Sequence, residues 1–122
     1  MSSSVENADS HLKMIEGEQL SAVTFVRDYV QLQFDGPTIT AVTRPIVASR
    51  DGRFDFGVLG YRDHLCDLIG RTVIQADVQG GERLTIDFGE HGSIVISLEP
   101  SAYRAAEAAI LTDDKHKTWA VW

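Results

Sequence analysis

The four histidines and the single cysteine are the side chains in this sequence best suited to metal binding or nucleophilic catalysis. His64 and Cys66 lie two residues apart, and on a helix this spacing separates their side chains by about half a turn. That geometry disfavours both a shared metal ion and a thiol–imidazole pair, and no second Cys or His pair accompanies it. The sequence therefore predicts no metal site and no catalytic cysteine, and it favours a buried or half-buried structural role for Cys66.

The carboxylates and glycines of the second half of the chain also lack a catalytic or cofactor-binding pattern. Asp77, Asp87 and Glu82 fall on outward strand positions or in turns, which argues against a catalytic carboxylate pair. The glycines at positions 80, 81, 89 and 92 fall in hairpin turns, and no Gly-x-Gly-x-x-Gly or phosphate-loop pattern is present. We therefore expect no catalytic residue and no cofactor.

One segment combines residue types that favour binding. Arginines and aromatic residues are interleaved between positions 44 and 62: Arg44, Arg50, Arg53, Phe54, Phe56, Tyr61 and Arg62. These residue types are enriched at interface hot spots, and guanidinium groups suit a carboxylate, a phosphate or an acidic partner segment. Asp51, Asp55 and Asp63 alternate with the arginines, so internal neutralisation is the competing interpretation. The sequence leaves both interpretations open.

Three residues near the C-terminus are expected to be structural anchors: Glu107, Trp119 and Trp122. Glu107 stands among alanines, where a carboxylate is either buried and bonded to backbone amides or an Arg, or exposed on one face. Anchoring is the favoured interpretation, ahead of simple exposure and of a catalytic role. The two tryptophans lie at a chain end, a place that usually frays, so at least one indole is expected to dock on the core.

The composition is typical of one globular domain, with 122 residues, 43% hydrophobic and 24% charged. The formal net charge of −7 argues against a general nucleic-acid binder, since phosphate affinity comes from clustered Lys and Arg. The single cysteine and the lack of a signal-peptide pattern favour a cytoplasmic location, and no apolar run approaches the ~18–20 residues of a membrane span. We expect a disordered leader over residues 1–9 and a single domain over residues 10–122.

An internal repeat predicts the elements that position these residues. The motif Leu-x-x-Ile-x-Gly-x-x-Leu at residues 12–20 returns 53 positions later as Leu-x-x-Leu-x-Gly-x-x-Val at residues 65–73. The offset grows to 54 and then to 55 at two turn signals, where extra length costs little. The sequence therefore predicts internal repeats over residues 12–45 and 65–100, followed by an extension over residues 101–122 with no counterpart in the first repeat.

Each repeat is predicted to contain a short helix and a three-stranded β-meander. Ser10 is expected to cap the first helix, the second helix spans about residues 61–69, and Gly17 and Gly70 are expected to end the two helices with positive φ. Apolar alternation predicts strands over residues 19–26, 29–34, 38–43, 72–78, 83–88 and 93–98. Residues 46–60 form the least regular segment.

The predicted fold class is mainly β (α+β). A three-stranded unit with one apolar face needs a partner layer, so the two units are expected to pack as one curled sheet or as a two-layer β structure. The helices are expected to cover open ends or flanks. The C-terminal tail is either a hairpin or a helix followed by a strand, since propensity alone favours a helix over residues 101–109.

A further pattern involves the repeated Leu-x-Gly, Gly-Arg-Thr-Val at residues 70–73, the Phe-rich second strands, Glu107-Ala108 and the terminal Trp122. It resembles a group of small bacterial domains of uncharacterised function, which look like two β-meanders, a Glu-Ala-Trp segment and a final strand ending in Trp. This chain departs from them with Ala109, where those domains often carry Trp. The resemblance implies a strand over residues 107–111 in place of the helix, and it implies no activity.

These observations favour a non-enzymatic binding or interaction domain that acts on an unidentified protein or a small acidic ligand. A sharper version, which rests on the charge alone, is an immunity-type or regulatory protein that neutralises a basic partner. One alternative is a small-ligand-binding domain or enzyme with a pocket between the two repeats, near Glu107 and residues 46–60. Another is the subunit of a homo-oligomer built through exposed strand edges.

Overall fold

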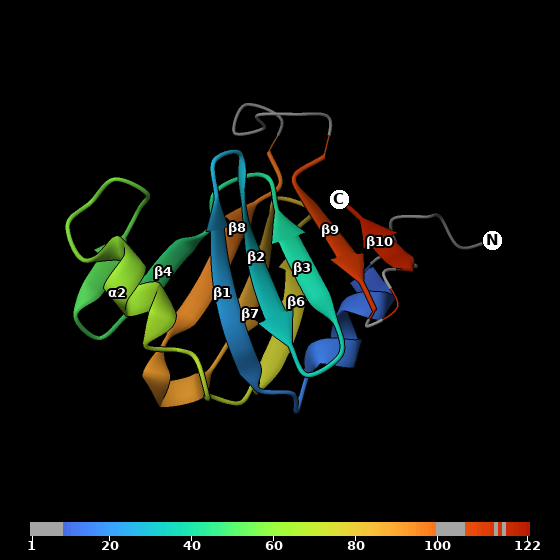
Figure 1. The fold of residues 1–122 in the computed structure, drawn as a ribbon, viewed down its shortest axis with the longest axis horizontal. Coiled ribbons are helices and arrows are strands. Elements are labelled where there is room, and N and C mark those ends of the chain that lie inside the picture. Colours follow the sequence, from blue (N-terminus) through green and yellow to red (C-terminus); the bar gives the residue numbers. More distant parts are fainter. Residues whose placement is uncertain (1–8, 100–106, 114, 116) are drawn as a thin grey trace.

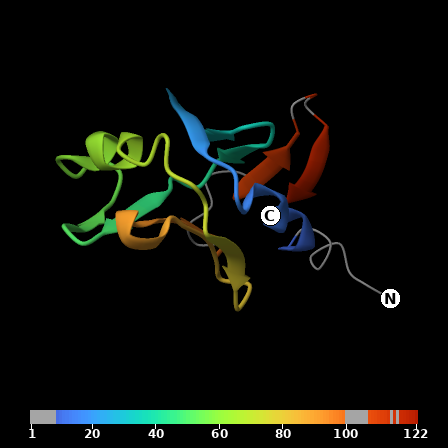
Figure 2. The same cartoon turned by 90° about the horizontal axis from the view of Figure 1, so that it is seen from below.

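The computed structural model describes residues 9–99, 107–113, 115 and 117–122. Within these residues the chain forms two five-stranded antiparallel sheets that face each other across the core (Figures 1 and 2). The first sheet has the order β1 (Leu20–Val26), β2 (Tyr29–Phe34), β3 (Thr38–Ala41), β9 (Ala109–Thr112) and β10 (Thr118–Val121). The second has the order β5 (Gly52–Phe54), β4 (Ile46–Ser49), β8 (Ser93–Ser97), β7 (Arg83–Asp87) and β6 (Gln75–Gln79). The mainly-β prediction is confirmed, in its two-layer form.

The central strands follow directly from the apolar alternation of the sequence. In β2 every second side chain is buried, and β7 and β8 repeat the pattern, so all three contribute one face to a shared core. The turn at residues 27–28 joins β1 to β2 by pairing Val26 with Tyr29, as expected. Two strand ends differ from the prediction by more than one residue: β3 ends at Ala41, and β6 begins at Gln75.

Each sheet contains the three strands of one copy and a two-stranded hairpin that follows the other copy in the sequence. After β3 the chain passes to the second sheet, where β4 pairs with β8. After β8 it returns to the first sheet, where β9 pairs with β3. The pairings correspond, since Val47 opposes Ile94 in one sheet and Leu111 opposes Ile39 in the other. Two predictions were therefore wrong: residues 46–60 contain a regular hairpin, and the C-terminal extension has the β4–β5 hairpin as its counterpart.

The two copies meet at a junction that supports the duplication. Gln19 and Thr72, which are 53 positions apart, form a β-bridge. The backbone hydrogen bonds around this bridge come in two pairs, and within each pair the two bonds join equivalent residues of the two copies. Gly17 N donates to Val73 O at 2.8 Å, and Gly70 N donates to Leu20 O at 2.7 Å. Leu20 N donates to Arg71 O at 3.0 Å, and Val73 N donates to Glu18 O at 2.9 Å. The two glycines have φ of 85° and 90°, so the predicted positive φ is confirmed. They turn the chain from each helix into this shared ladder.

The helical segment of each copy covers the first strand of the other copy. Residues 9–12 are helical and continue into the 3₁₀ helix η1 (Lys13–Ile15), which contacts β6, while α2 (Tyr61–Cys66) contacts β1. Glu16 accepts a hydrogen bond from the backbone N–H of Ala76 at 2.9 Å, and Lys13 forms an ion pair with Asp77 at 2.6 Å, so side chains cover the β6 edge of the second sheet.

The helix ends differ from the prediction. Ser10 lies inside the first helix, so it is not the predicted N-cap, and α2 ends at Cys66, before the predicted residue 69. None of the helices described is long and apolar enough to span a bilayer.

The C-terminus is tied to both the core and the N-terminal helix. Trp122 packs against the core, donates its Nε1–H to Asp9 at 3.0 Å, and pairs its backbone N–H with the Ala109 carbonyl at 2.9 Å. Trp119 is 36% exposed and donates to Asp113 at 3.0 Å. The tail therefore ends in a hairpin with one docked indole, as expected. Of residues 101–109, where propensity favours a helix, residues 101–106 lie outside the described residues; residues 107 and 108 are not helical and Ala109 begins β9, so the prediction was wrong at that end.

Candidate functional site

The seven residues proposed for binding occupy three different places. Arg44, Phe56 and Arg62 lie around the loop of residues 55–60, between β5 and α2. Tyr61 lies beneath that loop, in the core. The remaining residues are on or beside the β4–β5 hairpin: Phe54 against His64, Arg50 in the turn, and Arg53 on the outer face of the second sheet.

The loop of residues 55–60 presents apolar side chains to solvent. Phe56 and Val58 are each 47% exposed, and Leu59 is 96% exposed. The backbone is nevertheless held, because Val58 N donates to Asp55 O and Tyr61 N donates to Val58 O, both at 3.0 Å. Gly57 and Gly60, with φ of 89° and 90°, reverse the chain on either side of Val58 and Leu59. Local hydrogen bonding thus fixes an outward-facing apolar loop beside a cavity of about 260 Å³.

Two arginines stand against aromatic rings beside this loop. The Arg44 guanidinium lies 3.8 Å from the centre of the Phe56 ring, and its Nη2 donates to the Arg27 carbonyl at 3.0 Å. The Arg62 guanidinium lies 5.3 Å from the centre of the Phe25 ring. Within the described part of the chain, neither has a carboxylate within 4 Å, nor does Arg27. We call residues 55–60 together with Arg27, Arg44 and Arg62 the loop surface.

Internal neutralisation, the competing interpretation, holds for one of the four arginines proposed for binding. Arg53 Nε lies 3.3 Å from Asp55 Oδ1. Asp51 pairs with His64 instead of with an arginine, at 3.6 Å. No ion pair of Asp63 is found among the residues described. The alternation of Arg and Asp along the sequence therefore does not become a set of ion pairs in space.

Tyr61 supports the loop surface from within the core. It is 2% exposed, and its hydroxyl donates to the Pro45 carbonyl at 2.6 Å, which fixes the start of α2 against the β3–β4 connection. Burial raises the pKa of Tyr61 to about 12, with the charge of Asp55 adding to the effect. Phe56 rests edge-on against its ring at 5.9 Å. The proposal of Tyr61 as a binding residue is corrected: it positions Phe56.

His64 links α2 to the β4–β5 hairpin. Its ring stacks on Phe54 with centroids 3.8 Å apart, Nδ1 lies 2.9 Å from the Gly60 carbonyl, and Nε2 lies 3.6 Å from Asp51. The hydrogen bond to the Gly60 carbonyl raises the pKa of His64, and Asp51 raises it further against partial desolvation. Phe54 is therefore held in the stack and is not a free contact residue.

We expect His64 to titrate above its ordinary pKa of 6.5 in the folded protein. Its contribution to stability should be complete below that ordinary value and should be lost as the pH rises through the higher folded value. Nuclear magnetic resonance titration of the ring checks this. Asp51→Asn should lower the pKa more than Asp67→Asn, because Asp67 is the weaker influence. A folded pKa at or below 6.5, or the reverse order of the two variants, would contradict the assignment.

The side chains that could perform metal or thiol chemistry are not assembled for it. No group of three His, Cys, Asp or Glu side chains in the described residues is placed to hold a metal ion. Cys66 is exposed, so the expectation of a buried or half-buried cysteine was wrong. Desolvation, together with Asp63 and Asp67, raises the pKa of the Cys66 thiol, which opposes thiolate formation.

The segment around Glu107 anchors the first sheet through its backbone. Glu107 is half-buried, and the carbonyl of the next residue, Ala108, accepts hydrogen bonds from Val42 N at 2.8 Å and Thr43 N at 3.0 Å. These bonds hold β9 beside the end of β3. The anchoring role expected for the Glu107 carboxylate stays a prediction.

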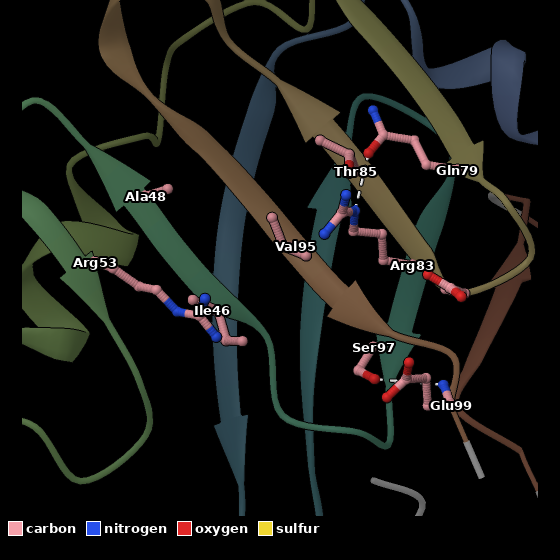
Figure 3. Close-up of a pocket in the computed structure, with 10 residues that line it drawn as sticks. Ile46, Ala48, Arg53, Gln79, Arg83, Thr85, Val95, Ser97 and Glu99 are labelled. Carbon is pink, nitrogen blue, oxygen red and sulfur yellow. Dashed lines mark hydrogen bonds between the residues drawn. The ribbon is translucent and has the colours of Figure 1, made fainter. Parts of the chain in front are cut away.

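The outer face of the second sheet contains a hollow that the sequence did not reveal. It has a volume of about 390 Å³ and brings together Arg53 and side chains from β4, β6, β7 and β8 (Figure 3). Arg83, Leu59 and Arg27 are further residues of these surfaces that sequence reasoning missed. A signal for Leu59 did exist, since glycines 57 and 60 enclose two apolar residues in a segment without strand alternation.

No family model, no curated protein and no solved structure matches this chain. The resemblance to small bacterial domains with two β-meanders therefore stays an expectation, and the candidate surfaces rest on their own geometry.

Proposed function

We propose that this protein is a non-enzymatic binding domain whose contact surface is the loop surface. The observation that carries the proposal is the 96% exposure of Leu59 at the tip of a hydrogen-bonded loop, beside Arg27, Arg44 and Arg62, which have no carboxylate within 4 Å among the described residues. Apolar side chains gathered on a surface cost solvation free energy that a partner can recover.

The partner is proposed to be a protein segment with apolar side chains and carboxylates. Arg44 is already held against Phe56, so its guanidinium loses less ordering entropy when a carboxylate binds. A partner of this kind would bury Leu59 and Val58 and would be oriented by Arg44 and Arg62. An immunity-type role toward a basic partner, suggested by the net charge of −7, would use other faces of the molecule.

Photo-cross-linking from position 59 in native lysate tests the proposal. Position 74 is the matched control, because Ile74 is also an exposed aliphatic residue, at 64%. We expect a discrete cross-linked product from position 59 that is absent from position 74. The double variant Arg44→Ala with Arg62→Ala should remove that product, whereas Arg71→Ala, a change at an exposed arginine elsewhere, should keep it. Equal labelling from positions 59 and 74 would overturn the proposal.

A further inference from the structure

The hollow on the second sheet arises from the lengths of its outward-facing side chains. Along β4 and β8, in the middle of the sheet, Ala48, Val95 and Ser97 are short. Arg53 on β5 and Arg83 on β7 are long and stand on opposite sides of Val95 (Figure 3). The volume of about 390 Å³ lies within the usual range of small-ligand sites, roughly 300–1,000 Å³.

The first sheet provides an internal control for this hollow. By strand register, Thr85 and Val95 of the second sheet are equivalent to Gln31 and Thr40 of the first. Gln31 Nε2 donates to Thr40 Oγ1 at 3.3 Å, so larger side chains bridge the surface there. Arg83 corresponds to Tyr29, so the first sheet also lacks that guanidinium. The hollow therefore comes from residues particular to the second sheet and is not imposed by the fold.

The two arginines keep hydrogen-bond donors available toward the hollow. Arg83 Nε donates to Gln79 Oε1 at 2.9 Å, and Arg53 Nε lies 3.3 Å from Asp55. A guanidinium has five N–H donors, and among the described residues these bonds use only the Nε–H of each arginine. The free Nη donors suit a carboxylate or a phosphate.

The opposite charge is found where β7 begins and β8 ends, beside the backbone of Arg83, whose guanidinium is turned away toward Thr85 (Figure 3). Ser97 and Glu99 lie together there (Figure 3), and Leu98 N donates to the Glu82 carbonyl at 2.8 Å, which brings Glu82 to the same end. Ile46 and Val95 provide an apolar floor between the two ends. A purely anionic ligand would be repelled by the glutamates, whereas a ligand with both charges satisfies both ends.

We propose that this hollow binds a small zwitterion of the amino-acid or peptide type. Its carboxylate or phosphate lies between Arg53 and Arg83, its ammonium group faces Glu82 and Glu99, and its apolar part rests on Val95. This site shares no residue with the loop surface, so either proposal can fail without the other.

The test uses chemical-shift mapping with a panel of free dipeptides that carry apolar side chains, at millimolar concentration. We expect shifts at the amides of Ala48, Thr85 and Val95. Amidating the C-terminus or acetylating the N-terminus of the same dipeptides should weaken binding, by about tenfold or more for loss of a charge-assisted hydrogen bond. O-Phosphoethanolamine distinguishes a phosphate from a carboxylate as the anionic group. No shift at these amides with any of these probes would overturn the proposal.

Two variants separate the site from the fold. Arg83→Gln should weaken binding by about tenfold or more, while Arg71→Gln should leave it unchanged. The double variant Thr85→Gln with Val95→Thr places the Gln31–Thr40 pair of the first sheet at the equivalent positions of the second sheet. These larger side chains should fill the hollow and abolish binding, while the rest of the amide spectrum stays unchanged. Shifts that persist in this filled variant would place the ligand elsewhere and overturn the assignment.

Discussion

Removing residues 119–122 should lower the free energy of unfolding by about 3–5 kcal/mol, the cost of deleting a packed indole. The truncation takes away Trp122, which packs on the core, and with it the hydrogen bonds that join its backbone to Ala108 and Ala109. It also removes most of β10, so β9 becomes the edge strand of the first sheet, paired only with β3. Urea unfolding followed by circular dichroism measures the loss.

Single substitutions divide this effect into its parts. Trp122→Phe keeps most of the packing but loses the bond from Nε1 to Asp9, and it should cost about 0.5–1.5 kcal/mol. Trp119→Ala is the control: that ring is 36% exposed, so the change should cost less than Trp122→Ala. A truncated protein with an unchanged urea midpoint would show that the docked tail contributes nothing to folding.

The six meander strands could be predicted because their signals are local. Alternation in residues such as Val30, Leu32 and Phe34 fixes which face is buried, and the turns predict the strand ends to within one residue except at the end of β3 and the start of β6. The positive φ of Gly17 and Gly70 could also be predicted, because Gly tolerates the left-handed region that ends a helix. The need of each apolar face for a cover predicted either one curled sheet or two layers, and the structure has two layers.

The exchanged hairpins could not be predicted from the repeat. β4 and β5 are four and three residues long, too short for a clear alternation. Their packing is equivalent to that of β9 and β10, but the side chains differ: Phe54 opposes Val47, while Ala120 opposes Leu111. The two hairpins therefore cannot be matched by comparing residue types. Their equivalence is seen only in the structure, where Val47 pairs with Ile94 and Leu111 pairs with Ile39.

The candidate site was predicted in part. The segment of residues 44–62 does provide an exposed surface with Arg44, Phe56 and Arg62, but Tyr61 is turned into the core by its bond to Pro45. Spacing along a chain does not show which residue faces inward where a loop enters a helix. The hollow on the second sheet depends on side-chain lengths in strands from both copies, including Ala48 and Val95, and no single stretch of sequence carries that information.

Gly92→Ala should be strongly destabilising, because a Cβ at this position would lie 2.6 Å from the Ala48 carbonyl oxygen. Gly92 ends the 3₁₀ helix η2 (Gly89–His91) with φ of 121° and accepts a bond from Phe88 N at 2.8 Å. Ala48 is paired with Ser93 on the adjoining strand, so the clash involves backbone on both sides and no side-chain rotation relieves it. Overpacking of this kind costs about 1–3 kcal/mol in addition to the backbone strain.

Gly36→Ala separates the two contributions. Gly36 has a similar φ of 109°, in the equivalent turn of the first copy, but apart from its own residue and its chain neighbours no atom lies within 4 Å of the added Cβ. Its substitution should cost only the strain of a left-handed backbone, on the order of 1–2 kcal/mol. Urea unfolding of both variants should therefore rank Gly92→Ala as the more destabilised. Equal losses would mean that β4 yields to the methyl group, and the β4–β8 pairing, which forms the floor of the hollow, would then be looser than its hydrogen bonding indicates.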